Sequence, residues 1–171
     1  MSSFDAKAHY FFKKSTLLEL EDAPEPLAAA LNLWRDRRGL GALPVRRSIL
    51  VTDLPLKLVG MTHLIDVEYE PDDQLQFRVR LYGTAIPVQT PERPEGRLMT
   101  EMGFGDGYEE IILSDYSDVV RSKSPCLHLY EGMLDHPDTG RPYVYNRLIL
   151  PLGDEEGRVV VLMVMSRTLA G

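Results

Sequence analysis

Three segments in the C-terminal third constrain the fold most, because each has the pattern of a β-strand and only short turns separate them. They span 126–134, 141–152 and 158–166, and the connecting turns are DHPDTG and GDEEG. Turns this short join neighbouring strands as hairpins, and the strands of a hairpin run antiparallel. Two more strands are predicted over 62–69 and 75–82, on either side of EPDDQ. The sequence therefore predicts a largely antiparallel sheet of five strands.

Two helices are predicted beside these strands. The first spans 24–39, PEPLAAALNLWRDRRG, where proline precedes and glycine follows apolar residues at helical spacing. The second spans 107–123, GYEEIILSDYSDVVRSK. Between the strand pair and the second helix, 84–107 contains three prolines and four glycines, which favours loops and short helical turns.

The strand patterns also indicate where each strand lies in the sheet. VVVLMVM (159–165) is apolar on both faces, which is typical of a central strand covered on both sides. LQFRVRLY (75–82) alternates, which is typical of an edge or half-solvated strand. We therefore predict an α+β domain with the middle helices on one face of the sheet and the first helix partly covering the other.

Length and charge limit the domain organisation and the function classes. With 171 residues the chain is predicted to form one domain over 24–171, preceded by an N-terminal arm over 1–23. Its net charge of −7 opposes binding to nucleic acid or to acidic membranes. One cysteine, the lack of a secretory signal pattern and the lack of an apolar run of membrane-spanning length favour a soluble cytoplasmic protein.

Several short motifs, taken in order, resemble a family of mostly single-domain PAS proteins from alphaproteobacteria. They are W-x-x-x-R-G at 34–39, P-V-R-R-S at 44–48, D-L-P at 53–55, R-L-Y-G-T at 80–84 and Y-N-R-L-I-L-P-L at 145–152. The resemblance covers about 25–168. PERPEG (91–96) departs from the G-x-D-x-T-G pattern that the family has there, so local remodelling of the helical middle is expected.

The resemblance implies a fold, a function and an expectation about cofactors. The five strands of a PAS domain lie in the order 2-1-5-4-3, and such domains act as sensory or regulatory modules. It implies that the protein binds a small ligand or a partner signalling protein, signals in trans, and forms a homodimer. Haem and flavin are not expected, because the second helix lacks a histidine and no N-C-R-F-L type motif occurs.

The candidate ligand-binding residues come from the predicted sheet and from the helix that covers it. Tyrosine suits an amphipathic pocket, and arginine or histidine could bind an acidic ligand. An alternative stays open for each kind: the tyrosines could pack a core, and the arginines could form surface ion pairs. The candidates are Arg80, Tyr82, Thr84, Tyr108, Tyr116, His128, Tyr130, Tyr145 and Arg147.

The first helix carries an apolar stripe, Leu27, Leu31 and Trp34, that could contact a second copy or a partner protein. In PAS proteins, helices in this position often mediate dimers. The alternative is that the stripe covers the sheet of its own domain.

A small cofactor-independent enzyme, of the isomerase or hydratase type, is the alternative function. Asp66, His63 and His128 are its obvious acid–base candidates, although no catalytic residue is assigned. Cys126 lacks a sequence feature that would lower its pKa and is interpreted as a structural thiol. No metal is predicted, because the histidines and acids lack compact ligand spacing.

Overall fold

The computed structural model describes residues 7–105 and 107–170, and the elements follow one another as a strand, two helices, two strands, a helix and three strands. The strands are β1 (Tyr10–Leu18), β2 (Thr62–Tyr69), β3 (Leu75–Leu81), β4 (Cys126–Leu134), β5 (Arg141–Gly153) and β6 (Val159–Ala170). The α-helices are α1 (Leu27–Arg38), α2 (Leu56–Val59) and α3 (Tyr108–Ser122). Short 3-10 helices span Leu20–Asp22, Arg46–Ser48, Val51–Asp53, Pro71–Asp73 and Met99–Glu101.

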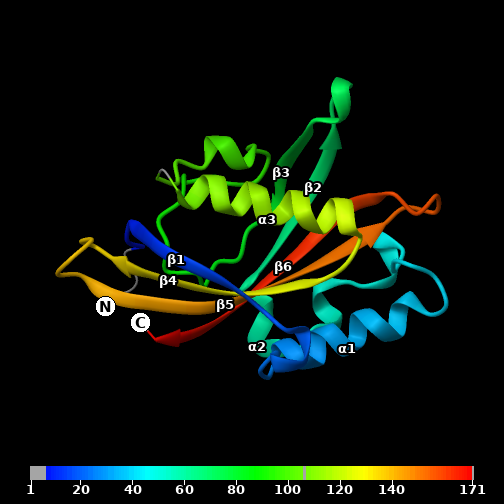
Figure 1. The fold of residues 1–171 in the computed structure, drawn as a ribbon, viewed down its shortest axis with the longest axis horizontal. Helices are drawn as coiled ribbons and strands as arrows, with labels where there is room; N and C mark the ends of the chain where they lie inside the picture. The colour runs from blue at the N-terminus through cyan, green and yellow to red at the C-terminus, as the bar shows by residue number, and fades with distance from the viewer. Residues whose placement is uncertain (1–6, 106, 171) are drawn as a thin grey trace.

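The described strands form one six-stranded sheet in the order β1-β4-β5-β6-β2-β3, and every neighbouring pair is antiparallel (Figure 1). The α+β class and the antiparallel sheet are therefore confirmed. The prediction of five strands is wrong, because a sixth strand, β1, pairs with β4 at one edge. The other five strands lie next to one another in the order β4-β5-β6-β2-β3.

Strand β1 corrects the expectation that residues 1–23 form an arm ahead of the domain. Residues 1–6 lie outside the described residues, but Tyr10 is already paired with Leu134 and Leu18 with Leu127. The pairing shifts register between Phe12 and Lys14, which marks a β-bulge. The N-terminal segment from residue 10 onward is thus part of the sheet.

Helices cover the two faces of the sheet as separate layers (Figure 1). Helix α3 packs on one face, over a core that includes Ile112, Tyr116 and Val119. Helix α1 packs on the opposite face, over a second core. Strand β6 contributes Leu162 and Val164 to the first core, and Val161, Met163 and Met165 to the second. The prediction of a central strand covered on both sides is confirmed.

Helix α1 is attached to the sheet by its apolar stripe. Leu27, Leu31 and Trp34 are at most 2% exposed, and the indole N–H of Trp34 donates to the carbonyl of Pro151 at 2.7 Å. The stripe therefore covers the sheet of its own domain, and the prediction that it offers a dimer or partner contact is wrong for the folded chain.

In the part of the chain that the structure describes, no helix is long and apolar enough to cross a membrane.

Gly132 on β4 allows β1 to approach closely. A Cβ atom at this position would lie 2.5 Å from the carbonyl oxygen of Phe11 and 2.6 Å from the ring of Tyr10. We expect Gly132→Ala to lower the free energy of unfolding by about 1–3 kcal/mol, since the backbone of β1 would have to move away. Urea denaturation measures the change.

Gly41→Ala is the matched control, because the nearest atom to its added Cβ would be an ordinary contact at 3.5 Å. We expect the control to change stability by no more than about 0.5 kcal/mol. Equal effects of the two substitutions would contradict the close approach of β1.

Candidate functional site

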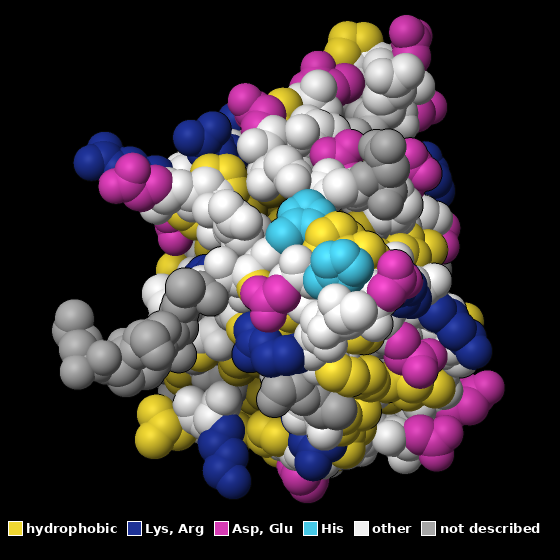
Figure 2. Space-filling view, turned by 90° about the vertical axis from the view of Figure 1, so that its left-hand side faces the viewer, with side chains coloured by type: hydrophobic (Ala, Val, Ile, Leu, Met, Phe, Trp, Pro, Cys, Tyr) yellow, Lys and Arg dark blue, Asp and Glu magenta, His cyan; other side chains and the backbone are white. Residues whose placement is uncertain are grey.

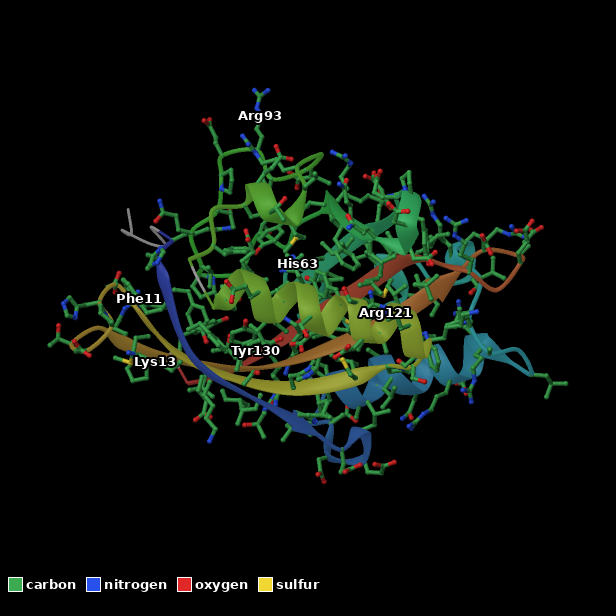
Figure 3. The ribbon with its side chains drawn as sticks, turned by 45° about the horizontal axis from the view of Figure 1, so that its top comes forward. Phe11, Lys13, His63, Arg93, Arg121 and Tyr130 are labelled. Atoms are coloured by element: carbon green, nitrogen blue, oxygen red, sulfur yellow. The ribbon has the colours of Figure 1, made fainter. Side chains whose placement is uncertain are left out.

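Cross-strand pairing places a row of polar and aromatic side chains on the face of the sheet that α3 covers. Tyr130 on β4 is the partner of Tyr145 on β5, and His128 is the partner of Arg147. Residues two apart on a strand share a face, so these four side chains lie on the same side. Figure 3 shows Tyr130 in the layer between the sheet and α3.

Tyr108 and Asp115 of α3 contact the same row of side chains from the helix side. Seven residues separate them, which is about two helical turns, so they share one face of the helix. The ring of Tyr10 on β1 packs against Tyr108 with a centroid separation of 4.7 Å. We name the buried group the Arg147 cluster; it consists of Tyr10, Tyr108, Asp115, Tyr130, Tyr145 and Arg147.

The guanidinium of Arg147 lies at the centre of this cluster. Its Nη2 atom donates to the hydroxyl oxygen of Tyr145 at 2.9 Å and to that of Tyr108 at 3.2 Å. The two hydroxyls are themselves hydrogen-bonded at 2.6 Å. The guanidinium carbon also lies 4.5 Å from the ring centre of Tyr130, which is a cation–π contact.

Burial keeps three hydroxyls of the cluster protonated. It raises the pKa of Tyr10, Tyr130 and Tyr145 above the ordinary value of a tyrosine. Burial also opposes the charge on Arg147, but the neighbouring tyrosine hydroxyls favour that charge and hold the pKa of Arg147 above its ordinary value. The cluster therefore contains a permanent cation among neutral phenols.

Asp115 is the carboxylate of the cluster, and it bonds to Tyr130 and His128 rather than to Arg147. The Tyr130 hydroxyl donates to Oδ2 of Asp115, and Nε2 of His128 lies 3.5 Å from Oδ1. Burial raises the pKa of Asp115, although the hydrogen bond from Tyr130 acts in the opposite direction. Among the described residues, no carboxylate forms an ion pair with Arg147.

Cys126 extends the polar row beyond His128, with Sγ 3.6 Å from Nδ1 of the imidazole. Burial raises the pKa of the thiol to about 12 and lowers the pKa of His128. At neutral pH the thiol is therefore protonated and the imidazole neutral. This state differs from the thiolate–imidazolium pair of an activated cysteine nucleophile.

The cluster contains buried polar atoms that lack a hydrogen-bond partner. They are the hydroxyl of Tyr10 and the Nε and Nη1 atoms of Arg147, as counted over residues 7–105 and 107–170. Tyr10 is 2% exposed and Arg147 is 4% exposed. Buried donors are nearly always satisfied in folded proteins, so three donors without a partner in one cluster require an explanation.

Four of the predicted ligand residues, Tyr108, Tyr130, Tyr145 and Arg147, belong to the cluster, and a fifth, His128, lies beside its Asp115. Tyr116 is buried on the same side of the sheet but packs with its ring edge against Phe77, 5.4 Å between centroids.

The other three predicted ligand residues lie outside the cluster. Tyr82 stacks on His63 with a centroid separation of 3.7 Å. Thr84 is exposed. Arg80 pairs with Asp66 at 2.9 Å on a partly exposed strand face, which supports the surface ion pair that was its alternative.

Tyr10 and Asp115 are cluster members that the candidate list lacks. Asp115 could have been found from its spacing, since it lies seven residues after Tyr108 on one predicted helix. Tyr10 belongs to the segment interpreted as an arm, so no pattern assigned it to the sheet.

One surface hollow among the described residues is lined entirely by residues outside the cluster. This hollow, of about 380 Å³, lies where the β2–β3 and β5–β6 turns meet the end of α3. It combines acidic Asp73 and Glu156 with basic Arg121 and Lys123, and Arg158 stacks on Tyr69 at 3.7 Å. Figure 2 shows a different face of the molecule, the left-hand side of Figure 1, on which acidic, basic and histidine side chains are interspersed. Among residues 7–105 and 107–170, no group of three or more His, Cys, Asp or Glu side chains could hold a metal.

Comparison of the sequence with protein-family models gave no match, and searches among curated proteins and among solved structures gave none either.

Proposed function

We propose that this protein is a PAS-like sensory or regulatory module that binds a small ligand in the Arg147 cluster and signals to a partner protein. The single observation that carries the proposal is the buried guanidinium of Arg147, whose Nε and Nη1 atoms have no partner among the described residues. Leaving such donors unsatisfied costs about 1–3 kcal/mol, and more for a charged group. A bound ligand would remove that cost.

The arrangement of the sheet supports the PAS-like part of the proposal. If the five predicted strands are numbered in chain order, β2 is strand 1 and β6 is strand 5. The observed order β3-β2-β6-β5-β4 then corresponds to 2-1-5-4-3. The ligand site of the proposal lies between this sheet and α3, where polar groups converge in an otherwise apolar layer. Strand β1 is an addition at the β4 edge that the resemblance does not include.

The position of the cluster offers a way to pass on a signal. Tyr10 belongs to the edge strand β1, and Tyr108 is the first residue of α3. A ligand that contacts both would favour the conformation in which the strand and the helix are docked together. Ligands shift conformational equilibria only through such differences in contact. The proposed partner, or a second copy of the chain, would recognise this docked conformation.

An enzyme of the isomerase or hydratase type is the second candidate function. The observation in its favour is the line formed by Cys126, His128 and Asp115, with separations of 3.6 and 3.5 Å. The raised pKa of the thiol opposes nucleophilic chemistry at this line, and the lowered pKa of the imidazole opposes its action as a general acid at neutral pH. Asp66 is already paired with Arg80, and His63 is buried as the acceptor of the Gly83 N–H at 2.8 Å. The sensory proposal is therefore preferred.

Native mass spectrometry of the purified protein, beside a denatured control, tests the proposal. We expect an added mass of a small molecule on the native protein that is lost on denaturation, and a subunit mass that reports whether the chain is a dimer. An empty protein that turns over a compound from a panel of small metabolites would contradict the sensory proposal and support the enzyme.

A further inference from the structure

We propose that the Arg147 cluster is a binding site for one small monocarboxylate, whose oxygens accept hydrogen bonds from Nε or Nη1 of Arg147 and from the hydroxyl of Tyr10. This inference rests on the proposed function, because it takes the ligand site from it and specifies the ligand class. It concerns Tyr10 and Arg147, which carry the buried side-chain donors that have no hydrogen-bond partner among the described residues.

The charge of the cluster favours an anion. The guanidinium stays protonated at any physiological pH, and the phenols around it are neutral. Asp115 accepts from Tyr130 and lies beside His128, so both of its oxygens have neighbours other than Arg147. A buried cation without an adjacent anion is costly, and a bound carboxylate would provide the missing partner.

The hydrogen-bonding capacity of the cluster also favours an acceptor. Nη2 of Arg147 is used by two tyrosine hydroxyls, whereas the N–H groups of Nε and Nη1 remain. Tyr108 and Tyr145 share one O–H···O bond, which uses one of their two hydroxyl protons and leaves the other to donate elsewhere. The unused groups, which include the Tyr10 hydroxyl, can all donate hydrogen bonds, so a ligand must carry hydrogen-bond acceptors.

The surroundings restrict the ligand further. One arginine supplies one positive charge, which matches a single carboxylate better than a di- or trianion. Phe12 and Phe104 are half-buried and pack against Tyr108, with centroid separations of 5.8 and 5.2 Å. Both rings are apolar neighbours of the cluster near the start of α3. The rest of the ligand is therefore expected to be apolar, as in an aromatic or short aliphatic acid.

Calorimetric titration with sodium benzoate tests the inference, with benzamide as the uncharged analogue and sodium chloride keeping the ionic strength constant. We expect benzoate to bind and to raise the melting temperature, and benzamide to do neither. Acetate, titrated in the same way, tests whether the carboxylate alone is sufficient. No binding of either carboxylate would overturn the inference.

Three variants show whether binding uses the cluster. Arg147→Met keeps an unbranched side chain without the charge and should abolish benzoate binding. Tyr10→Phe removes only a hydroxyl that has no partner among the described residues, and it should raise Kd about 10-fold. Tyr69→Phe is the control, because its hydroxyl donates to the carbonyl of Val159 at 2.7 Å on a different part of the sheet. Its Kd should match that of the wild type.

The variants also separate the inference from the proposed function. Should Arg147→Met fail to fold, Tyr10→Phe still tests the site. Unchanged affinity in Tyr10→Phe and in a folded Arg147→Met would overturn the inference. A retained neutral molecule in native mass spectrometry, together with no carboxylate binding, would overturn the inference and leave the sensory function standing. Benzoate binding that depends on Arg147, in a protein that also turns over a metabolite, would support the inference and contradict the sensory function.

Discussion

Trp34→Ala is expected to lower the free energy of unfolding by about 3–5 kcal/mol, the range for truncation of a large buried aromatic side chain. Trp34 is 2% exposed and packs in the core between α1 and the sheet. Its indole N–H also donates to the carbonyl of Pro151 on β5. The substitution would leave a cavity and remove the hydrogen bond to Pro151 at the same place. Chemical denaturation, followed by circular dichroism, measures the loss.

Two further substitutions on α1 separate packing from hydrogen bonding and from helix propensity. Trp34→Phe keeps most of the apolar ring but removes the N–H, so a smaller loss of about 1–3 kcal/mol is expected. Asn32→Ala changes an exposed position of the same helix and should stay within about 0.5 kcal/mol. A loss below about 0.5 kcal/mol in Trp34→Ala would mean that α1 does not dock on the sheet, and the stripe would again be a candidate contact for a partner.

The second large effect is a loss of stability in mild acid. Burial lowers the pKa of His63 well below 6.5, and repulsion from Arg147 acts in the same direction. Burial also lowers the pKa of His128, although Asp115 opposes the shift. Below pH 6.5 the unfolded chain therefore binds protons that the folded chain does not. Stability is fully present above the unfolded pKa and falls as the pH drops below it, by about 1.4 kcal/mol per pH unit for a histidine that stays neutral in the folded state, as expected for His63.

Asp115 acts in the opposite sense, because a raised carboxyl pKa means that the folded state holds its proton more tightly. As the pH falls, Asp115 begins to add stability at a pH above 3.8, its ordinary pKa. This gain offsets part of the stability that the histidines lose in acid. Urea denaturation between pH 7.5 and 5 measures the sum. His63→Asn keeps an acceptor for the N–H of Gly83 but cannot be protonated, so it should remove about 1.4 kcal/mol per pH unit from the slope. An unchanged slope in this variant would contradict a neutral, buried His63.

Much of the fold could be predicted from the sequence, because most strands and both long helices have clear periodicity. The hairpin of β2 and β3, the three C-terminal strands and the helices at 24–39 and 107–123 all appear close to their predicted bounds. Strand β1 could not be predicted, for a physical reason. Its bulge at Lys13 interrupts the alternation of inward and outward side chains, so YFFKKSTLL does not have the pattern of a regular strand.

The candidate site could be predicted only in part. Once β4 and β5 are paired as a hairpin, Tyr130 with Tyr145 and His128 with Arg147 follow from register. The burial of Arg147 does not follow, because an arginine in a strand usually faces solvent and only the packing of α3 over the sheet encloses it. The burial of Asp115 could not be predicted for the same reason, since an acidic residue on a helix normally marks the exposed side of that helix.

The pairing of Tyr10 with Leu134 has a consequence for how the site comes into being. These two residues are 134 − 10 = 124 positions apart in the sequence, so their contact closes one of the longest loops in the fold. Loop closure of this length is slow, and edge strands open locally at a lower cost than central ones. We therefore expect the cluster to be completed late in folding and to open locally before the central strands do. Occupancy of the site would thus be recorded in the amide hydrogen exchange of β1, slow when a ligand holds the strand and fast when the site is empty.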